Sequence, residues 1–499
     1  MPEFDLWSAL PTLVPAGWGL MVLVFSPLFR EDRRWLWACS VVGMALSLLI
    51  PALMLPRLDA FGDFRETAGV AGLFMLRVDR LALWLDVLFA LAGLATVLLL
   101  PHYLEKTKAH RPEVYPLSFL AVAGMTLMVG SENLVMIFLG LEILSIPLYV
   151  LVGTAREKAE AVEGSLKYFL LGAFSTCFLV YGLALVLAAT GHFDLPGIAA
   201  ALRANDGLAP YGSVALFTGL GLILVAFAFK VGAAPFQFWV PDVYQAAPTP
   251  VAGFMAVGTK AAAFVVLLRV LHTGFGGAPE TAQRWGAAVA ALSALTMIVG
   301  NLLALAQRRL KRLLAYSSVA HAGYLALALL APLPVAAPNL VFYLFAYGFM
   351  TIGAFAVVSL FQREGADADD LFQFAGLWKR RPWLAGSLAI FLLSMAGIPP
   401  LAGFDGKLVI FLAALQSGHA GLAALMAVAA VVGAAYYLRV VTTMFLREPE
   451  DPLSSEIRVP LSARFVLGVA VLGTIILGVF PGLLLDPLSL VHRALAPLS

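Results

Sequence analysis

Long, almost uncharged apolar runs recur along this chain and restrict it to one kind of fold. A helix that crosses a bilayer needs about 20 mostly apolar residues. Of the 499 residues, 61% are apolar and 12% are charged, whereas soluble globular proteins carry about 25% charged residues. These polar residues are too few to cover a water-soluble fold. The sequence therefore predicts an all-α polytopic membrane protein.

Hydropathy and length predict about fourteen transmembrane helices. They lie near residues 8–28, 35–55, 81–103, 115–131, 133–153, 166–190, 211–246, 249–272, 285–306, 313–332, 337–361, 383–417, 420–446 and 463–486. The N-terminal sequence is acidic and has no basic region before the first run, so this run is expected to be a retained span. No loop is long enough to house a soluble domain.

The distribution of lysine and arginine predicts the orientation of the chain. If the N-terminus lies outside and all segments cross, the inner loops hold 20 of the 32 basic residues and the outer loops hold 7. Cytoplasmic loops carry an excess of Lys and Arg, so both termini are expected on the outer side. The net charge of +2 leaves no basic face for nucleic acid, and no nucleic-acid partner is expected.

The sequence predicts no metal or redox centre within this chain. Cys39 and Cys177 lie in apolar runs and offer neither a disulfide framework nor a metal site. No phosphate-binding loop, dinucleotide-binding glycine motif or haem-like histidine pair is present in the sequence. The energy for any transport is therefore expected to come from an ion gradient or from another subunit.

Two of the predicted segments are too long for one straight span. The segment near 211–246 contains Pro235, and the segment near 383–417 contains Pro400. Proline removes a backbone donor and clashes with the preceding turn, so each segment is expected to unwind locally. Broken helices at corresponding positions are typical of transporters built from repeats.

The two breaks predict that the chain contains two related halves. Each broken segment is the fourth element of a five-helix block, so the second block starts from the opposite side and the blocks are expected to be inverted repeats. The expected regions are 1–114 with three N-terminal helices, 115–272 with the first repeat, 285–446 with the second repeat, and 447–499 with a C-terminal helix.

Four charged residues, Glu142, Lys230, Lys260 and Lys407, fall near the middle of predicted spans. Each charge at the bilayer centre costs at least about 2.5–3.5 kcal/mol on insertion scales. A static Glu142–Lys230 ion pair would leave the other two lysines without a carboxylate at their depth, except for Asp405. Burial disfavours the charged form of lysine and a nearby carboxylate favours it, so such lysines can gain and lose protons. We interpret the four residues as a proton relay, with Asp405 as a further candidate.

Polar residues elsewhere in the spans give weaker signals. His321 shares a helical face with Tyr324, and it is either a satisfied buried histidine or a further member of the relay. Arg269 and Arg439 lie toward the ends of their helices and are expected to snorkel to the interface.

Acidic residues near helix ends are expected to have structural roles. Asp79, Glu132 and Asp242 lie near predicted helix ends, where an acidic side chain commonly caps the free backbone N–H groups.

Several long motifs along the chain match a known pattern. They are KVGAAPFQFWVPDVYQAAPTPVAGFMAVGTKAAAF, FLGLEILSIPLYVLVG, EGSLKYFLLGAFSTCFLVYGLAL, RRLKRLLAYSSVAHAGY and LSMAGIPPLAGFDGKL. Together they resemble the antiporter-like membrane subunits of proton-pumping NADH:quinone oxidoreductase (respiratory complex I). The resemblance covers most of the chain and is weakest at its two ends. The APTPV sequence and the lysine, rather than glutamate, in the twelfth span resemble subunit N most.

The resemblance implies a role for each relay residue. Glu142 and Lys230 would be the pair whose separation tunes proton uptake, Lys260 would be the central relay group, and Lys407 would pass the proton toward the periplasmic exit. The family usually has a histidine after the first break, where this chain has Gln237. Glutamine can order water but cannot titrate, so a scheme that needs a protonatable group at this position does not carry over.

The resemblance also implies partners and a location. This chain would hold no cofactor, while partner subunits would hold FMN, iron–sulfur clusters and quinone, and quinone reduction there would drive the relay. The other membrane and peripheral subunits of complex I and the lipid bilayer would be its partners, in the cell inner (plasma) membrane with both termini on the periplasmic side. Two alternatives stay open: a proton-conducting subunit of a multisubunit Na⁺/H⁺ antiporter, and a stand-alone ion-coupled solute transporter.

Overall fold

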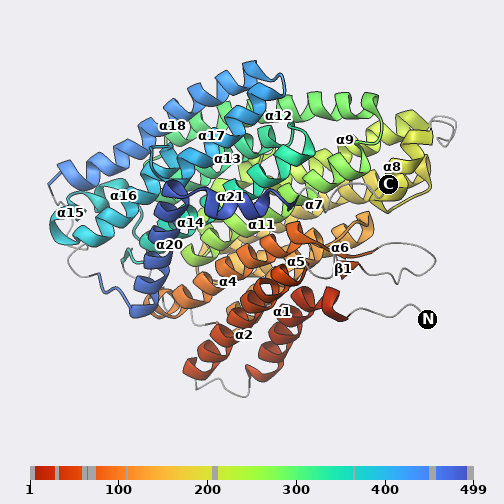
Figure 1. The fold of residues 1–499 in the computed structure, drawn as a ribbon. Helices are drawn as coiled ribbons and strands as arrows, with labels where there is room; N and C mark the ends of the chain where they lie inside the picture. Colours follow the sequence, from red (N-terminus) through yellow and green to blue (C-terminus); the bar gives the residue numbers. More distant parts are fainter. Residues whose placement is uncertain are drawn as a thin grey trace.

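The computed structural model describes residues 6–27, 33–58, 64–65, 75–107, 111–204, 212–363, 366–448 and 457–491. These parts of the chain are almost entirely α-helical and contain two short antiparallel ribbons. Ten of the described helices are long and apolar enough to cross a membrane. Figure 1 shows the helices packed side by side, with α1 and α2 at one edge of the bundle. The predicted all-α membrane architecture is confirmed.

The N-terminal region contains three long helices and one ribbon. Its elements are α1 (Leu6–Phe25), α2 (Arg33–Met54), η1 (Leu55–Arg57), β1 (Phe64–Arg65), β2 (Arg77–Val78) and α4 (Arg80–Thr107). Strand β1 pairs with β2 in antiparallel register, with Phe64 opposite Val78.

The next region contains the first broken helix. Its elements are α5 (Val114–Val129), α6 (Leu134–Val152), α7 (Ala159–Thr190), α8 (Leu195–Ala204), α9 (Gly212–Val231), η3 (Gln237–Trp239), α10 (Val240–Ala246), α11 (Thr249–Arg269) and the π-helical turn η4 (Val270–Gly274). Helices α9 and α10 are the two arms of the broken segment.

The remaining region contains the second broken helix. Its elements are α12 (Pro279–Leu305), α13 (Leu310–Ala328), α14 (Leu333–Val358), β3 (Gln362–Arg363), β4 (Ala366–Asp367), η5 (Leu371–Phe374), α15 (Leu377–Arg380), α16 (Pro382–Ala396), α17 (Ala402–Gln416), α18 (Ala420–Leu446), α20 (Leu461–Val479) and α21 (Gly482–Leu488). Helices α16 and α17 are the arms of this break. Each of the predicted runs overlaps at least one of the observed helices.

Each break combines a left-handed glycine with a following proline. Gly232 has φ 71° and Gly397 has φ 90°, values at which a side chain is disfavoured and glycine is favoured. Pro235 and Pro400 then prevent the helix from continuing, because proline has no N–H and clashes with the preceding turn. The predicted local unwinding is therefore confirmed at both places.

The backbone groups freed at the breaks are bonded to other parts of the protein. The N–H of Ala234 donates to Thr296 Oγ1 of α12 at 3.0 Å. The N–H of Gly403 donates to Ser394 Oγ of α16 at 3.0 Å. Because lipid offers no hydrogen-bonding groups, irregular backbone at membrane depth is stable only where protein or water satisfies it.

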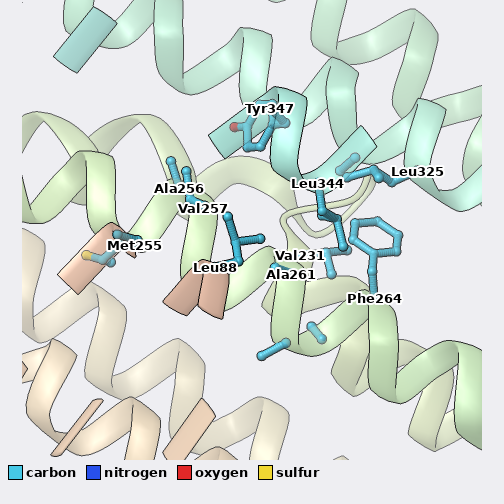
Figure 2. Close-up of a cluster of buried hydrophobic side chains, with 14 of the residues drawn as sticks. Leu88, Val231, Met255, Ala256, Val257, Ala261, Phe264, Leu325, Leu344 and Tyr347 are labelled. Carbon is cyan, nitrogen blue, oxygen red and sulfur yellow. The ribbon is translucent and has the colours of Figure 1, made fainter. Parts of the chain in front are cut away.

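Helix α11 lies at the centre of the bundle. All of its residues are buried, and α4, α5, α9, α13 and α14 pack around it. Figure 2 shows Val257 and Ala261 of α11 next to Leu88 of α4 and Leu344 of α14. Lipid tails are as apolar as these side chains, so close van der Waals packing and interhelical hydrogen bonds hold the bundle together.

Candidate functional site

Lys230 lies on the last turn of α9, directly before the first break, and is 4% exposed. Its Nζ donates to Ser145 Oγ of α6 at 2.6 Å. The ammonium also lies 5.6 Å from the ring centroid of Tyr168 and 6.0 Å from that of Tyr149, where the ring faces attract a cation. Lys230 is therefore held by a hydroxyl group and two aromatic rings.

Glu142 lies on α6, one turn before Ser145, and is half-buried. Its Oε1 accepts a hydrogen bond from Thr176 Oγ1 of α7 at 2.7 Å. Glu142 and Lys230 make no direct ion pair in the described structure, because each is bonded to a different hydroxyl. Thr176 and Lys230 nevertheless line the same small cavity. The structure thus brings the two predicted partners close to each other without joining them.

Lys260 lies in the middle of α11 and is 2% exposed. Its Nζ donates to the backbone oxygen of Ser318 on α13. Tyr244 and Tyr347 lie near the side chain of Ser318, and the Tyr347 hydroxyl has no hydrogen-bond partner among the described residues. The central lysine therefore contacts α13 close to two tyrosines.

His321 follows Ser318 by one turn of α13 and is 1% exposed. Its Nδ1 lies 2.6 Å from the Tyr343 hydroxyl and its Nε2 lies 3.2 Å from the Tyr437 hydroxyl. A neutral imidazole donates from one nitrogen and accepts at the other, so both ring nitrogens are satisfied. His321 is also within electrostatic range of Lys260 and Lys407. It is therefore a satisfied buried histidine that lies near both lysines, and its membership of the relay stays a prediction.

Lys407 lies on α17, after the second break, and is 8% exposed. Its Nζ donates to the carbonyl oxygens of Met395 at 2.7 Å and Ala396 at 3.1 Å. These are the last carbonyls of α16, which have no partner within that helix and carry the negative end of its dipole. The ammonium also lies 5.3 Å from the ring centroid of Tyr324.

One face of α13 joins the two halves of the site. Ser318, His321 and Tyr324 are spaced three residues apart, and residues at this spacing are neighbours on a helix. Ser318 contacts Lys260 and Tyr324 contacts Lys407. We call the five residues Lys260, Ser318, His321, Tyr324 and Lys407 the polar row.

Two other predicted candidates lie outside the polar row. Asp405 is half-buried, its Oδ2 has no hydrogen-bond partner among the described residues, and it makes no ion pair with Lys407. Gln237 lies in η3 and is half-buried, and its Oε1 likewise has no partner within the described parts of the chain.

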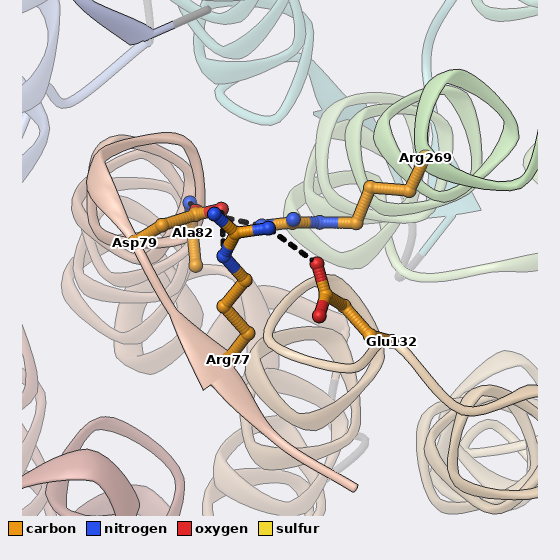
Figure 3. A network of polar contacts seen from close by, with 5 residues as sticks. All are labelled: Arg77, Asp79, Ala82, Glu132 and Arg269. Carbon is orange, nitrogen blue, oxygen red and sulfur yellow. Dashed lines mark hydrogen bonds and ion pairs between the residues drawn. The ribbon is translucent and has the colours of Figure 1, made fainter. Parts of the chain in front are cut away.

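The predicted snorkelling of Arg269 is wrong. Arg269 is fully buried, and its Nη2 lies 2.6 Å from Asp79 Oδ1. Beside it, Arg77 Nη1 lies 2.6 Å from Glu132 Oε1 (Figure 3). Asp79 also caps α4 as predicted, since the N–H of Ala82 donates to its Oδ1 at 2.9 Å. A carboxylate from a distant part of the sequence therefore pairs with the buried Arg269, while its Nε and Nη1 have no hydrogen-bond partner among the described residues.

Asp242 and Arg439 also have partners that the sequence did not predict. Asp242 makes no cap at the start of α10 and instead pairs with Arg312 at 2.9 Å. Arg439 of α18 donates to the carbonyl oxygens of Leu305 at 2.9 Å and Gln307 at 2.6 Å, at the end of α12.

Lys311 is a buried charge that the sequence placed in a loop. It lies on the first turn of α13, is fully buried, and donates to the carbonyl oxygens of Gln245 at 3.0 Å and Ala247 at 2.9 Å. The signal that could have found it is its spacing from Ser318, because seven residues are two turns on one helical face.

The described residues contain no group of three or more His, Cys, Asp or Glu side chains that could hold a metal ion. Cys39 is half-buried and Cys177 is exposed, and both are free thiols.

Comparison with known proteins identifies the family of the chain. The profile described as "NADH:quinone oxidoreductase/Mrp antiporter, TM" matches residues 131–433. The chain belongs to this family. NADH-quinone oxidoreductase subunit N of Chloroflexus aggregans is 39% identical over 501 residues, which cover 100% of this chain and 99% of the relative. NADH-quinone oxidoreductase subunit N 2 of Roseiflexus castenholzii is 42% identical over 490 residues, 96% of this chain and 95% of the relative.

Solved structures of the antiporter family share the fold. A chain of respiratory complex I from Thermus thermophilus is 36% identical, with a TM-score of 0.79 over 95% of this chain and 98% of that one. A chain of the Mrp complex from Dietzia has a TM-score of 0.84 at 22% identity over 98% of both chains, which shows the fold alone. The predicted resemblance to the antiporter-like subunits, and to subunit N among them, is confirmed.

Proposed function

We propose that this chain is the proton-translocating subunit N of a bacterial NADH:quinone oxidoreductase, located in the plasma membrane. The full-length likeness to subunit N relatives supports the assignment to this complex. The observation that carries the transport function is the polar row, a buried sequence of ionisable and hydroxyl side chains from Lys260 to Lys407 in the middle of an apolar bundle.

The polar row has the chemical groups that proton transfer requires. Hydroxyl groups and a neutral imidazole can donate and accept at the same time. A proton that leaves Lys260 can pass through His321 and the tyrosine hydroxyls around it to Lys407, with water completing the gaps. The carbonyls of Met395 and Ala396 then hold the protonated Lys407.

Glu142 and Lys230 control this transfer from the first break. In this proposal the side chain of Lys230 turns from Ser145 toward Glu142, across the small cavity that Lys230 and Thr176 line. Opposite charges attract more strongly in a low-dielectric interior than in water, so a close pair retains the proton on Lys230 and a separated pair favours its release. Quinone reduction in partner subunits drives the change between the two arrangements.

The other parts of the machinery belong to other subunits. FMN, the iron–sulfur clusters and the quinone are held by the membrane and peripheral subunits of complex I that assemble with this chain. The excess of basic residues in alternate loops supports an orientation with both termini on the periplasmic side. We define the opposite, basic face as the inner face.

In this proposal, residues 115–272 and residues 285–446 form two five-helix blocks that are inverted repeats of each other. Both blocks have the broken helix as their fourth element, and both breaks have a left-handed glycine before the proline. The fifth helix of each block carries an arginine in its C-terminal half. Arg269 of α11 bonds to Asp79, and Arg439 of α18 bonds to the Leu305 carbonyl.

The replacement Lys230→Ala tests the relay. We expect NADH-driven proton uptake by inverted membrane vesicles to be lost or sharply reduced, while the complex still assembles, because the alanine cannot carry a proton. Lys379→Ala is the matched control, since Lys379 is exposed and paired with Glu448. Normal proton uptake in Lys230→Ala would overturn the relay assignment.

Purification of the tagged protein in mild detergent tests the assignment to complex I. We expect it to bring down subunits with flavin and iron–sulfur signals and NADH:quinone activity. A set of hydrophobic partners without redox centres would instead indicate a multisubunit Na⁺/H⁺ antiporter, and a protein that works alone would indicate a solute transporter.

A further inference from the structure

A cavity of about 830 Å³ lies at the inner ends of α1, α2, α4 and α5. Figure 1 shows these helices at one edge of the bundle. Helix α1 packs against α2 and α5, and α2 packs against α4. We call this cavity the N-terminal cavity. No member of the polar row lines it, and its volume lies within the range of about 300–1,000 Å³ that is typical of ligand sites.

One part of the wall of the N-terminal cavity is apolar. Leu36 of α2 and Leu104 of α4 are buried there, and Leu23 of α1 lines the cavity while remaining exposed. Pro101, inside α4, lines it as well. A small polar ion would leave this surface unused, whereas hydrocarbon chains pack against it by van der Waals contact. The cavity is therefore suited to a ligand with an apolar portion.

The other part of the wall carries charged groups of both signs. Arg34 of α2 and Arg111 directly before α5 are basic, and Glu105 of α4 and Glu113 directly before α5 are acidic. Arg111 Nη2 lies 3.1 Å from Glu157 Oε1. Because a guanidinium group has five N–H donors, this contact leaves donors for a ligand. The cavity can thus bind an anionic group and a cationic group of one ligand.

Trp37 of α2 adds an uncharged donor to the N-terminal cavity. Its side chain lines the cavity, and its Nε1 is buried without a hydrogen-bond partner in the described parts of the chain. The indole N–H can only donate, so a ligand oxygen would satisfy it. Tryptophan is enriched where the hydrocarbon of a bilayer meets the headgroups, because its ring is apolar and its N–H is polar.

We propose that the N-terminal cavity binds a phospholipid whose headgroup carries both a phosphate and a primary ammonium, such as phosphatidylethanolamine. Arg34 and Arg111 bind the phosphate, and Trp37 donates to an oxygen of the same lipid. Glu105 and Glu113 accept hydrogen bonds from the ammonium. The acyl chains lie along the apolar wall.

The bound lipid would hold the two N-terminal helices in place. Lipid tails are as apolar as the helices, so no hydrophobic driving force presses α1 and α2 against α4 and α5. A phospholipid that bonds to groups on α2, on α4 and before α5 adds polar contacts across this boundary. The site is independent of the proposed relay.

The test uses the assembled complex in liposomes that contain a phosphatidylethanolamine with a diazirine on the acyl chain near the headgroup. After illumination, mass spectrometry quantifies the label on the peptides that contain Trp37 and Leu104. The variant combines Arg34→Gln with Arg111→Gln. Glu157→Gln is one control, because it removes the ion pair of Arg111 and leaves both arginines. Arg447→Gln is the other, because Arg447 is exposed and does not line the cavity.

We expect the label on these peptides to fall by about tenfold in the arginine variant, since a charge-assisted hydrogen bond corresponds to about this factor in an equilibrium constant. Both controls retain the label. Equal labelling of the arginine variant and the wild type would overturn the site. Absence of label from both peptides in the wild type would also overturn it, because another segment would then fill the cavity.

Competition in the wild type tests the nature of the ligand without any substitution. We expect unlabelled phosphatidylethanolamine to displace the probe about tenfold better than phosphatidylglycerol, which has no ammonium for the two carboxylates. Equal displacement by the two lipids would overturn the preference for an ammonium. Displacement by inorganic phosphate alone would overturn the assignment to a lipid. Neither result depends on whether Lys230→Ala pumps protons.

Discussion

The two broken helices differ in the groups that hold the lysine beside each break. Lys230 is held by the Ser145 hydroxyl and two aromatic rings, all of them side-chain groups from other helices. Lys407 is held by main-chain carbonyls of Met395 and Ala396, which belong to the other arm of its own broken helix. The lysine beside the first break is therefore held by side chains, and the lysine beside the second break by main-chain carbonyls.

The arginines on the fifth helix of each block repeat this difference. Arg269 of α11 pairs with the carboxylate of Asp79, a side chain. Arg439 of α18 binds the carbonyl oxygens of Leu305 and Gln307, which are main-chain groups. Side chains can change rotamer while the helices stay in place, whereas a carbonyl moves only with its backbone. The first block is thus suited to switching and the second block to holding a fixed geometry.

The largest expected effect is a loss of stability in variants of the two arginines. Arg269→Leu leaves Asp79 buried without its main partner, and breaking a buried ion pair costs about 3–5 kcal/mol. Arg439→Leu removes hydrogen bonds at a half-buried helix end, which we expect to cost about 1–2 kcal/mol. The measurement is the temperature at which the detergent-solubilised complex loses this subunit. Equal losses in the two variants would contradict the difference between the blocks.

The next effect compares the two lysines. Lys407→Met leaves two buried carbonyls without a donor, and each such group costs about 1–3 kcal/mol. Lys230→Met leaves Ser145 with its remaining bond to the Leu141 carbonyl, so no group loses its only partner. We expect both variants to lose proton uptake, and Lys407→Met to be less stable by about 2 kcal/mol or more. Equal thermal stability would show that the carbonyls find other donors.

A smaller effect concerns the hydroxyl that holds Lys230. Ser145→Ala removes a hydrogen bond to a charged group, worth about 1.5 kcal/mol, and leaves Lys230 free to turn toward Glu142. We expect slower NADH-driven proton uptake at unchanged assembly. Ser175→Ala is the control, since its hydroxyl binds only the neutral Ala226 carbonyl at 3.2 Å. Unchanged uptake in Ser145→Ala would remove this serine from the switch.

The smallest effect is expected at the position where the family usually has histidine. Gln237→His introduces a group that can titrate, but Gln237 lies outside the polar row and has no partner to lose among the described residues. We expect a change in stability of about 0.5 kcal/mol or less and no change in proton uptake. A clear rise in uptake, measured in the same vesicles, would contradict this and show that the first break needs a titratable group.

Local sequence was enough to predict the helical membrane architecture, the two breaks and the burial of Lys230, Lys260 and Lys407. Apolar runs, prolines and mid-span charges are local features, and Pro235 and Pro400 lie where the helices end. What the sequence could not predict is pairing over long distances. Arg269 was expected at the interface because it lies toward the end of its predicted helix, whereas its partner Asp79 lies 190 residues away.

The same limitation applies to the partners of Lys311 and to those of Glu142 and Lys230. Lys311 belongs to a basic loop motif, and only the fold shows that the α10–α11 turn covers it. The sequence offered a static Glu142–Lys230 ion pair only as the alternative to a relay. Each side chain is bonded to a hydroxyl group, Lys230 to Ser145 and Glu142 to Thr176, and neutral polar side chains in a span give no strong signal in the sequence.

The complete burial of α11 has a consequence for how the protein is made. The ribosome delivers α11 before α13 and α14, yet those later helices cover it, and Ser318 of α13 supplies the hydrogen bond to Lys260. During synthesis this lysine therefore has to enter the membrane before its acceptor exists. Helices α4, α5 and α9 precede α11 in the chain and also pack against it, so they can enclose the charge until the second half of the chain arrives.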